Sequence, residues 1–285
     1  MRPFAYARPE TISELQDALA SDDQARVLCG GTDLVVRLRS GHTHARVVVD
    51  VKHVRDLSDG IVDTGAWARV GARATMTTLG EDALVCQHFP ALVEAANVVG
   101  SVQIRNRATL AGNICNASPA ADTAPALLVY GAVVNALGPV GPRQIPIGDF
   151  FVGPGKTALA PREFVESIDL PIPAAPAGSA FARITRRYGV DLATVNLCCR
   201  VDASGDVRFA YGAVAPTPFL ASTDERFDVA HDDARQFVAP LVAQTRPISD
   251  VRGSADYRTA MVEVMSRRAL ELAAKRLRAR RGDAT

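Results

Sequence analysis

The sequence predicts an α+β protein of two domains. Strand patterns and helical patterns occur in separate stretches rather than in strict alternation. The segment LPIPAAPAG at positions 170–178 is the best candidate for a linker, because repeated proline fixes an extended path. The chain after it begins with strand patterns and ends in a helix. We therefore expect domains at 1–173 and 179–285, with two lobes in the first domain, about 1–55 and 56–173.

Composition and charge exclude several classes of protein. The 285 residues are 48% hydrophobic and 22% charged, as in a globular protein. With 32 Lys and Arg against 31 Asp and Glu, the net charge of +1 provides no basic field for nucleic acid. The N-terminus lacks an apolar h-region, so we expect no signal peptide. Proline and glycine interrupt the uncharged stretch 123–142, so we expect no membrane span.

The cysteines and histidines indicate neither a disulfide framework nor a metal site. The chain has five cysteines, and none forms a CxxC pair. A reducing cytoplasm fits this pattern best. His42 and His44 have no third ligand pattern near them, so we interpret them as exposed loop residues.

In the first domain, the strongest local signals are caps and apolar periods. Thr11 and Glu14 have the spacing of a capping box, and the apolar positions after them predict a helix. A short strand at 26–28 is predicted to run into Gly30 and Gly31. The further predictions are strands at 47–49, around Val70 and at 126–134, the last of them buried, and a helix at 89–99 that Gly100 ends.

In the second domain, the segments 181–201 and 207–214 have strand character, and a helix is predicted from about Asp256. The helix ends in a basic run, which includes Arg276 and Arg280. We interpret this run as a solvated last turn, where cations oppose the negative end of the helix dipole. Docking of an acidic partner is the alternative.

The familiar nucleotide-binding and hydrolase motifs are absent from the sequence. The residues 153–157, GPGKT, look like the end of a P-loop, but that motif needs a glycine where Phe150 stands. No GxGxxG, GxSxG or HExxH sequence occurs.

The first segment with a possible function is 27–34, VLCGGTDL. A strand enters two glycines, and a hydroxyl and a carboxylate follow. Adjacent glycines let successive N–H groups point into one concavity, which suits a phosphate, and Thr32 adds a hydroxyl donor. Since no lysine is present for a γ-phosphate, a pyrophosphate fits better than a nucleoside triphosphate. On this segment alone, we prefer an ordinary strand–turn–helix connection with Asp33 as N-cap.

The second segment is 100–122, GSVQIRNRATLAGNICNASPAAD. It lies between an apolar helix and an apolar run, and its dense polar side chains need partners. One interpretation is a network of side chains that holds two loops together. The other is a bound polar ligand, contacted by the backbone N–H groups of Gly112 and Asn113.

Together, the two segments strongly resemble the FAD-binding medium subunit of the molybdenum hydroxylases, the superfamily of xanthine dehydrogenase and carbon monoxide dehydrogenase. That family carries a GGTDL-like segment and a GSxQIRNxGTxGGN…SPxxD segment, which here are 30–34 and 100–122. Further ordered matches are Phe4 and Pro9, EFVESIDLP at 163–171, Arg186-Arg187 with 191–193, 250–254 with 257–258, and 267–270. The resemblance covers nearly the whole chain. It implies a vanillyl-alcohol-oxidase-type (PCMH-type) FAD-binding domain, followed by a smaller α+β domain of the CO dehydrogenase flavoprotein type.

The resemblance also implies roles for individual residues. Backbone N–H groups of Gly30, Gly31 and Thr32 would hold the FAD pyrophosphate, and Asp33 would fix the loop or a ribityl hydroxyl. Asp122 would bind a hydroxyl of FAD, Val165 would contact the edge of the flavin ring, and Arg183 would place a cation near the flavin. The complete predicted set is Leu28, Cys29, Gly30, Gly31, Thr32, Asp33, Leu34, Thr109, Ala111, Gly112, Asn113, Ser118, Asp122, Val165 and Arg183.

There are two departures from the family pattern at the second segment. Ala108 and Ala111 stand where glycine is common, and a methyl group there narrows the approach of the backbone. Cys29 and Cys115 lie in or beside the two segments. We interpret them as small wall residues rather than as redox centres.

The function implied by the resemblance is electron transfer within a three-chain complex. A large subunit would hold molybdenum–pterin, and a small subunit would hold two 2Fe–2S clusters. Noncovalent FAD on this chain would pass their electrons to an acceptor such as NAD, a quinone or O2. Two alternatives are a stand-alone FAD-dependent oxidoreductase and a scaffold subunit that has lost FAD.

Overall fold

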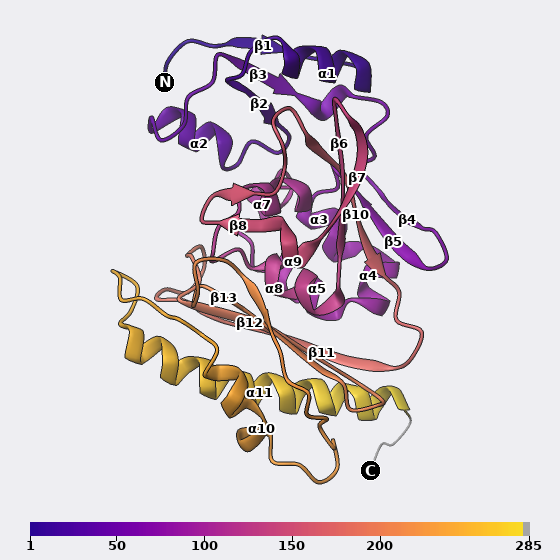
Figure 1. Cartoon of the computed structure of the whole chain (residues 1–285), viewed down its shortest axis with the longest axis vertical. Coiled ribbons are helices and arrows are strands. Elements are labelled where there is room, and N and C mark those ends of the chain that lie inside the picture. The colour runs from indigo at the N-terminus through magenta and orange to yellow at the C-terminus, as the bar shows by residue number, and fades with distance from the viewer. Residues whose placement is uncertain (282–285) are drawn as a thin grey trace.

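The computed structural model describes residues 1–281, so the last four positions of the predicted second domain lie outside the described residues. The molecule has three tiers along its longest axis, in chain order (Figure 1). An N-terminal lobe lies at one end, a helix-rich middle part follows, and a four-stranded sheet with two helices lies at the other end. Among the described residues, no helix is long and apolar enough to cross a membrane.

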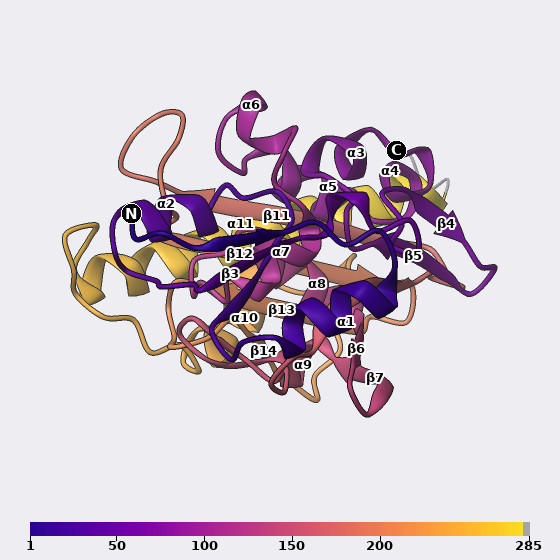
Figure 2. The ribbon, with the colours of Figure 1, turned by 90° about the horizontal axis from the view of Figure 1, so that it is seen from above.

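The N-terminal lobe is a three-stranded parallel sheet with one helix on the chain between each pair of strands. The sheet order is β1-β3-β2. Its elements are β1 (Ala5–Ala7), α1 (Ile12–Ala20), β2 (Ala25–Leu28), α2 (Leu34–Arg39), β3 (Val47–Asp50) and the short η1 (Val51–His53). The Thr11 hydroxyl accepts a hydrogen bond from the Glu14 N–H, as the capping box predicts, but the Glu14 carboxylate accepts from Glu10 instead of Thr11. Figure 2 shows this lobe from above.

The middle part is an antiparallel five-stranded sheet with helices packed beside it. The sheet order is β4-β5-β10-β6-β7. The strands are β4 (Ile61–Asp63), β5 (Trp67–Gly71), β6 (Val133–Gly138), β7 (Gly141–Pro146) and β10 (Phe164–Pro171), with a small hairpin of β8 (Phe151–Gly153) and β9 (Lys156–Thr157). The helices are α3 (Met76–Glu81), α4 (Ala83–His88), α5 (Pro90–Asn97), α6 (Val102–Arg105), α7 (Leu110–Cys115), α8 (Thr123–Tyr130) and α9 (Ile147–Phe150).

The buried strand predicted at 126–134 is wrong, because most of this run forms helix α8. All eight residues of α8 are buried, so the run shows no polar face and no helical period in the sequence. Gly131 ends the helix in the left-handed conformation, with a φ of 68°. Pro125 is tolerated because it lies in the first turn, where its missing N–H costs no hydrogen bond.

The C-terminal part is an antiparallel sheet with strands in sequence order, β11 (Ala177–Ile184), β12 (Val195–Asp202), β13 (Val207–Gly212) and β14 (Phe219–Ala221). The predicted single strand at 181–201 is therefore wrong: it is the end of β11, a loop at 185–194, and most of β12. Helix α11 (Ala255–Arg281) packs on this sheet, and α10 (Ala234–Val242) packs on α11 and shares the same apolar core. Helix α11 begins within one residue of its predicted start.

The two parts on either side of the proline-rich connection share a large contact. Helix α8 packs against β12 and β13, and α5 packs against β11. Cys198 and Ala210 of the C-terminal sheet belong to the apolar core of the middle part. The Tyr130 hydroxyl lies 2.6 Å from the Ser179 hydroxyl across the junction.

The basic run at the end of α11 is largely exposed, as predicted, but two of its arginines also bond to other elements. Arg276 donates to the Ser179 carbonyl at 2.7 Å and pairs with the Glu94 carboxylate. Arg280 donates to the carbonyls of Ala177 and Gln87. These arginines bind the helix to the rest of the molecule.

Candidate functional site

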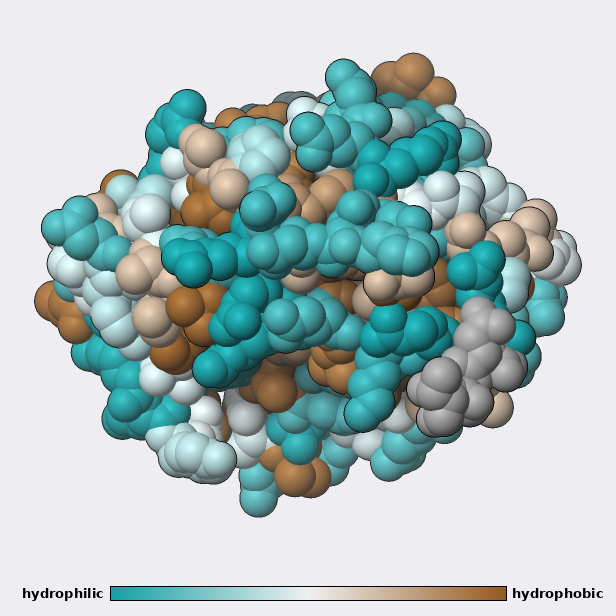
Figure 3. Space-filling view, turned by 90° about the horizontal axis from the view of Figure 1, so that it is seen from below, coloured by the Kyte–Doolittle hydropathy of each residue, from teal (hydrophilic) through white to brown (hydrophobic). Residues whose placement is uncertain are grey.

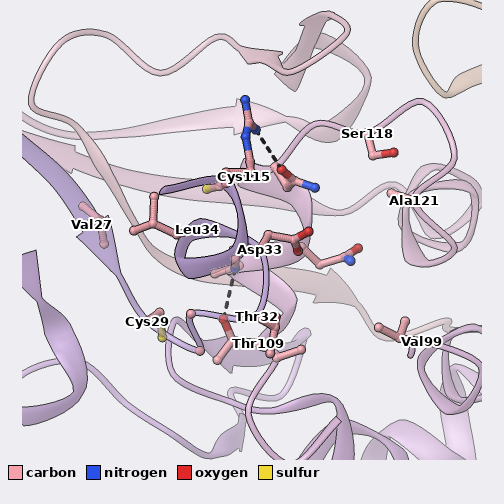
Figure 4. A pocket seen from close by; sticks show the side chains of 18 of the residues that line it. Val27, Cys29, Thr32, Asp33, Leu34, Val99, Thr109, Cys115, Ser118 and Ala121 are labelled. Carbon is pink, nitrogen blue, oxygen red and sulfur yellow. Dashed lines mark hydrogen bonds between the residues drawn. The ribbon is translucent and has the colours of Figure 1, made fainter. Parts of the chain in front are cut away.

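The two glycine-containing segments meet at a cavity of about 820 Å³. The cavity lies between the N-terminal lobe, the segment 99–122 of the middle part and the loop between β11 and β12. Figure 4 shows Thr32, Asp33 and Leu34 in its wall with Thr109 nearby and Ser118 and Ala121 on another side. A cavity of this size is in the range that holds cofactor-sized ligands.

Most of the predicted site residues line this cavity. Leu28 does not, because its side chain packs with Leu38 in the core of the N-terminal lobe. Arg183 does not line it either, although it bonds to residues that do. The predicted residues in the wall are Cys29, Gly30, Gly31, Thr32, Asp33, Leu34, Thr109, Ala111, Gly112, Asn113, Ser118, Asp122 and Val165.

Gly30 is the point where the two segments touch. A Cβ on Gly30 would overlap the carbonyl oxygen of Arg107 and would lie 3.1 Å from the Cα of Ala108. Only glycine allows this backbone-to-backbone contact without a shift of one segment. Gly31 has a φ of 77°, in the left-handed region that favours glycine. The glycine pair therefore sets both the turn and the approach of the second segment.

The turn after β2 presents backbone donors without partners. Within residues 1–281, the N–H groups of Gly30, Gly31, Thr32 and Asp33 donate no backbone hydrogen bond, and no side chain accepts from them. Asp33 occupies the N-cap position of α2, but its side chain makes no capping bond. Four successive free N–H groups next to a cavity form a concavity suited to an anion.

The short helix α7 and the turn after it form a further part of the wall. The Thr109 hydroxyl accepts from the Gly112 N–H at 3.1 Å, and a Cβ on Gly112 would lie 2.9 Å from that hydroxyl. The Asn113 amide oxygen accepts from the Thr123 hydroxyl at 2.7 Å. The structural network that the sequence left open is therefore present, and it holds α7 and α8 in place around the cavity.

A hydrogen bond links the two lobes at the cavity. Arg37 on α2 donates to the side-chain oxygen of Asn116, which caps the end of α7, at 3.2 Å. Both residues line the cavity. Arg37 therefore places a cation close to the free N–H groups of the first segment.

Asp122 is held by two side chains of the C-terminal part. Arg183 donates to its Oδ2 at 2.8 Å, and Asn196 donates to its Oδ1 at 3.0 Å. Burial raises the pKa of Asp122 to about 6, and Arg183 and Asn196 oppose that rise. Arg183, whose side chain is 11% exposed, is an internal residue at the domain junction rather than a surface charge on its strand.

The other carboxylates of the wall have different environments. Glu163 pairs with Arg143 at 2.7 Å, and this bond lowers the pKa of Glu163. Asp33 forms no ion pair within residues 1–281, and burial raises its pKa although Arg37 opposes this. The cavity therefore carries cations and carboxylates together, which suits a ligand with both anionic groups and hydroxyls.

The cavity cysteines behave as wall residues. Burial raises the pKa of Cys29, so at neutral pH this residue is a thiol rather than a reactive thiolate. Cys115 is exposed in the wall. Within the described residues, no group of three or more His, Cys, Asp or Glu side chains could hold a metal ion.

Sequence reasoning missed one part of the wall, the loop residues Arg187, Val190, Asp191 and Leu192. They come from the C-terminal part, more than sixty residues after Asp122 in the chain. The match of Arg186-Arg187 and 191–193 to the family pattern was the available signal, but nothing in their spacing indicates that they fold back onto the cavity. Arg26, Arg37 and Asn116 also line the cavity and were not in the predicted set.

The fold and the cavity define a class of protein in which a cofactor-sized cavity lies between an N-terminal lobe and the parts that follow it. Comparison with known families is consistent with this. Residues 2–173 match the family model described as the FAD binding domain in molybdopterin dehydrogenase, and residues 179–273 match the CO dehydrogenase flavoprotein C-terminal domain. The chain belongs to this family, the FAD-binding medium subunits of the molybdenum hydroxylases. It is thus an FAD-binding oxidoreductase subunit.

Relatives resemble the chain along nearly its whole length. It is 32% identical to a xanthine dehydrogenase FAD-binding subunit of Escherichia coli O157:H7, over 93% of this chain and 94% of the relative. It is 33% identical to a carbon monoxide dehydrogenase medium chain of Afipia carboxidovorans, over 96% of this chain and 97% of the relative. It is also 29% identical to a nicotine 6-hydroxylase medium subunit of Paenarthrobacter nicotinovorans, over 93% of this chain and 95% of the relative.

Solved structures share the fold. A chain of carbon monoxide dehydrogenase from Hydrogenophaga pseudoflava superposes with a TM-score of 0.90 at 29% identity, covering 97% of this chain and 99% of its own. A chain of quinoline 2-oxidoreductase from Pseudomonas putida 86 gives a TM-score of 0.87 at 26% identity, covering 96% and 98%. These matches confirm the predicted fold class.

Proposed function

We propose that this chain is the electron-transfer subunit of a molybdenum-containing hydroxylase. In this proposal it receives electrons from 2Fe–2S clusters of a small subunit and delivers them to an external acceptor such as NAD, a quinone or O2. A large subunit holds the molybdenum–pterin cofactor and the substrate. When bound, FAD supplies the exchange between one-electron and two-electron carriers.

The observation that carries the proposal is the meeting of the two segments at Gly30. Their contact places four free N–H groups, at residues 30–33, beside a cavity of about 820 Å³. A diphosphate is an acceptor of the right kind for such a row of donors. Arg37 in the same wall adds a positive charge. These features fit FAD, whose diphosphate lies in the middle of the molecule.

The remaining wall residues suit the other parts of the cofactor. Thr109, Gly112 and Asn113 lie in the wall next to the first segment, and we propose that they help to orient the cofactor. Asp122 and Ser118 offer oxygen atoms to hydroxyls. Val165 lies in β10 where its pairing with β6 shifts register, and such an irregularity turns a backbone group toward a site.

We propose that FAD is bound noncovalently. The cysteines in the wall are Cys29 and Cys115, and the raised pKa of the Cys29 thiol disfavours its attack on the flavin. All five cysteines are free thiols in the structure. This agrees with the cytoplasmic location that we propose for the complex, because thiols stay reduced there.

The surface around the cavity supports a subunit that works in a complex. Exposed large apolar side chains occur repeatedly in the segments that line the cavity. They are Val27, Val35, Val36, Val98, Val102, Ile104, Tyr188, Val190 and Leu192. Apolar side chains gathered around a cofactor site are typical of a surface that a protein partner covers. A stand-alone FAD-dependent oxidoreductase, the main alternative, would not need such a surface.

The test is metal and flavin analysis of the tagged chain purified from the cells that make it. The proposal predicts FAD together with iron and molybdenum in the same chromatographic peak. FAD without either metal would favour the stand-alone oxidoreductase and contradict the proposal. Iron and molybdenum without flavin would favour the scaffold that has lost FAD.

A further inference from the structure

Arg183 joins three segments around the cavity although it does not line the cavity itself. It lies near the end of β11 and is almost fully buried. Its Nη1 atom donates to the Asp122 carboxylate and to the Val98 carbonyl, both at 2.8 Å, and its Nη2 atom donates to the Asp191 carbonyl at 2.8 Å. A planar guanidinium presents its donors in fixed directions, so one side chain can hold three acceptors in a defined arrangement.

Each acceptor belongs to the wall of the cavity or adjoins it. Asp122 is in the wall, and Val98 precedes Val99, which is also in the wall. Asp191 belongs to the segment 187–192, most of which lines the cavity. Figure 4 shows Val99 and Ala121, the neighbour of Asp122, on the same side of the cavity. Arg183 therefore stands behind one wall and connects it to the loop of the C-terminal part.

The loop at 185–194 has little apolar packing of its own. Tyr188 is fully exposed, and Val190 and Leu192 are 57% and 55% exposed. The Asp191 carboxylate accepts from the Leu192 N–H at 3.0 Å and lies 3.4 Å from the Arg187 side chain, and both contacts are within the loop. Arg186 also ties the loop to the Val251 carbonyl, at 3.2 Å, on the side of the loop before α11. The bond from Arg183 to the Asp191 carbonyl is the tether that joins the loop to Asp122 and Val98 at the cavity.

We propose that Arg183 is a positioning residue of the FAD site, which holds the segment 187–192 in place so that this segment completes the cavity. The inference rests on the proposed function and deepens it. Arg183 acts through Asp122 and Asp191 and does not contact the cofactor. This differs from the role that the family resemblance implies, a cation beside the flavin.

The experiment compares R183Q, R183K and wild-type full-length chain without FAD, by hydrogen exchange of peptides that cover 186–192. Loss of bonds from a charged group predicts about tenfold faster exchange of this segment in R183Q. The Kd for FAD, from quenching of flavin fluorescence, is expected to rise about tenfold as well. The exchange rate and the Kd of R183K should lie between those of wild type and R183Q, since lysine keeps the charge beside Asp122 but lacks the planar fork of donors.

The matched control is R208Q. Arg208 lies on β13 of the same sheet and pairs on the surface with Asp206 at 3.5 Å. Its substitution should leave exchange of 186–192 and the Kd at wild-type values. The exchange of β12 in each variant shows whether the sheet itself is intact.

Wild-type exchange of 186–192 in both Arg183 variants would overturn the inference, whatever the Kd. A raised Kd with unchanged exchange would indicate direct contact between Arg183 and FAD. A wild-type chain that failed to bind FAD would contradict the proposed function. The exchange comparison needs no cofactor, so it would still test the role of Arg183.

Discussion

At the scale of single residues, the proposed FAD site depends on a contact that tolerates no side chain. Gly30 lies against the backbone of Arg107, so the position of one segment fixes that of the other. The four free N–H groups next to this contact keep their arrangement only while the two backbones stay in touch.

Gly30→Ala should therefore separate the two segments. The new methyl group overlaps the Arg107 carbonyl, and overpacking of this kind costs about 1–3 kcal/mol. The Kd for FAD should rise at least about tenfold, as measured by fluorescence titration. Gly148→Ala is the control, because a methyl group on Gly148 would have no other atom within 4 Å. Equal affinities of the two variants would contradict the role given to Gly30.

Asp122 makes the folded chain less stable as the pH rises, because the pKa of its carboxyl is raised on folding. Its pKa in the folded chain is about 6, above the ordinary value of 3.8, because burial outweighs the partners Arg183 and Asn196. Between these two values the folded chain keeps a proton that the unfolded chain has lost. Rising pH therefore favours the unfolded chain over this range.

Asp122→Asn should remove this pH dependence. A pKa difference of about 2 corresponds to about 3 kcal/mol. The free energy of unfolding of wild type, minus that of the variant, should therefore fall by roughly this amount between pH 4 and pH 7. Urea unfolding of both proteins at several pH values measures it. A difference that stays constant, or that grows with pH, would show that the carboxyl has no raised pKa.

Most of the residues predicted from the sequence lie in the wall, although they form only part of it, for a physical reason. Contiguous segments such as 29–34 and 109–113 carry their own geometry, because glycine conformations and local caps depend on near neighbours. Arg187 and Leu192 are brought to the cavity by the packing of a distant sheet, which no local pattern encodes. The role of each wall residue toward FAD stays a prediction.

At the scale of elements, the clearest difference between prediction and structure is α8. Apolar runs without a polar face carry no period, so a buried helix and a buried strand look alike in the sequence. Amphipathic elements were easier: α1, α5 and α11 were predicted with small errors at their ends, since each has a polar face and a recognisable cap or stop.

Helix α11 is anchored at its start by one buried arginine. Arg258 is 2% exposed and donates to the carbonyls of Thr194 and Ala213, at 2.6 and 2.9 Å, and to the Asp250 carboxylate at 2.6 Å. Although burial of Asp250 raises its pKa, the Arg252 N–H and the Arg258 and Arg252 side chains lower it to about 2. The loop before the helix and two strands of the sheet therefore meet at this side chain.

Arg258→Met should destabilise the chain by about 3 kcal/mol, because it leaves two carbonyls and a carboxylate without their donor. Chemical unfolding at pH 7 measures this loss. Arg268→Met, at an exposed position of the same helix, should change stability by less than about 0.5 kcal/mol. Similar losses in both variants would indicate an effect on the helix alone.

At the scale of the whole molecule, the two predicted domains are closely joined. The division into domains at 1–173 and 179–285 stays a prediction. Arg276 and Arg280 nevertheless connect the end of α11 to Glu94 and Gln87 in the middle part. Figure 3 shows that the face seen from below is mostly hydrophilic with scattered hydrophobic residues. Two arginines of the exposed basic run thus hold the end of α11 to the middle part.

Arg276→Ala should weaken this junction. Both partners of the Arg276–Glu94 pair are about one third exposed, so solvent screens the pair and the expected loss is about 1 kcal/mol. Lys275→Ala is the control, since Lys275 is exposed and forms no ion pair within residues 1–281. In thermal unfolding, Arg276→Ala should have a lower midpoint temperature than Lys275→Ala. Equal midpoints would contradict the proposed junction.

The central claim is that the meeting of the two glycine-containing segments creates a site for noncovalent FAD. The most direct measurement is an absorbance spectrum of the purified chain, repeated on the supernatant after heat denaturation. We predict flavin bands near about 450 nm that move into the supernatant. A colourless chain that stays colourless after incubation with FAD would contradict the claim.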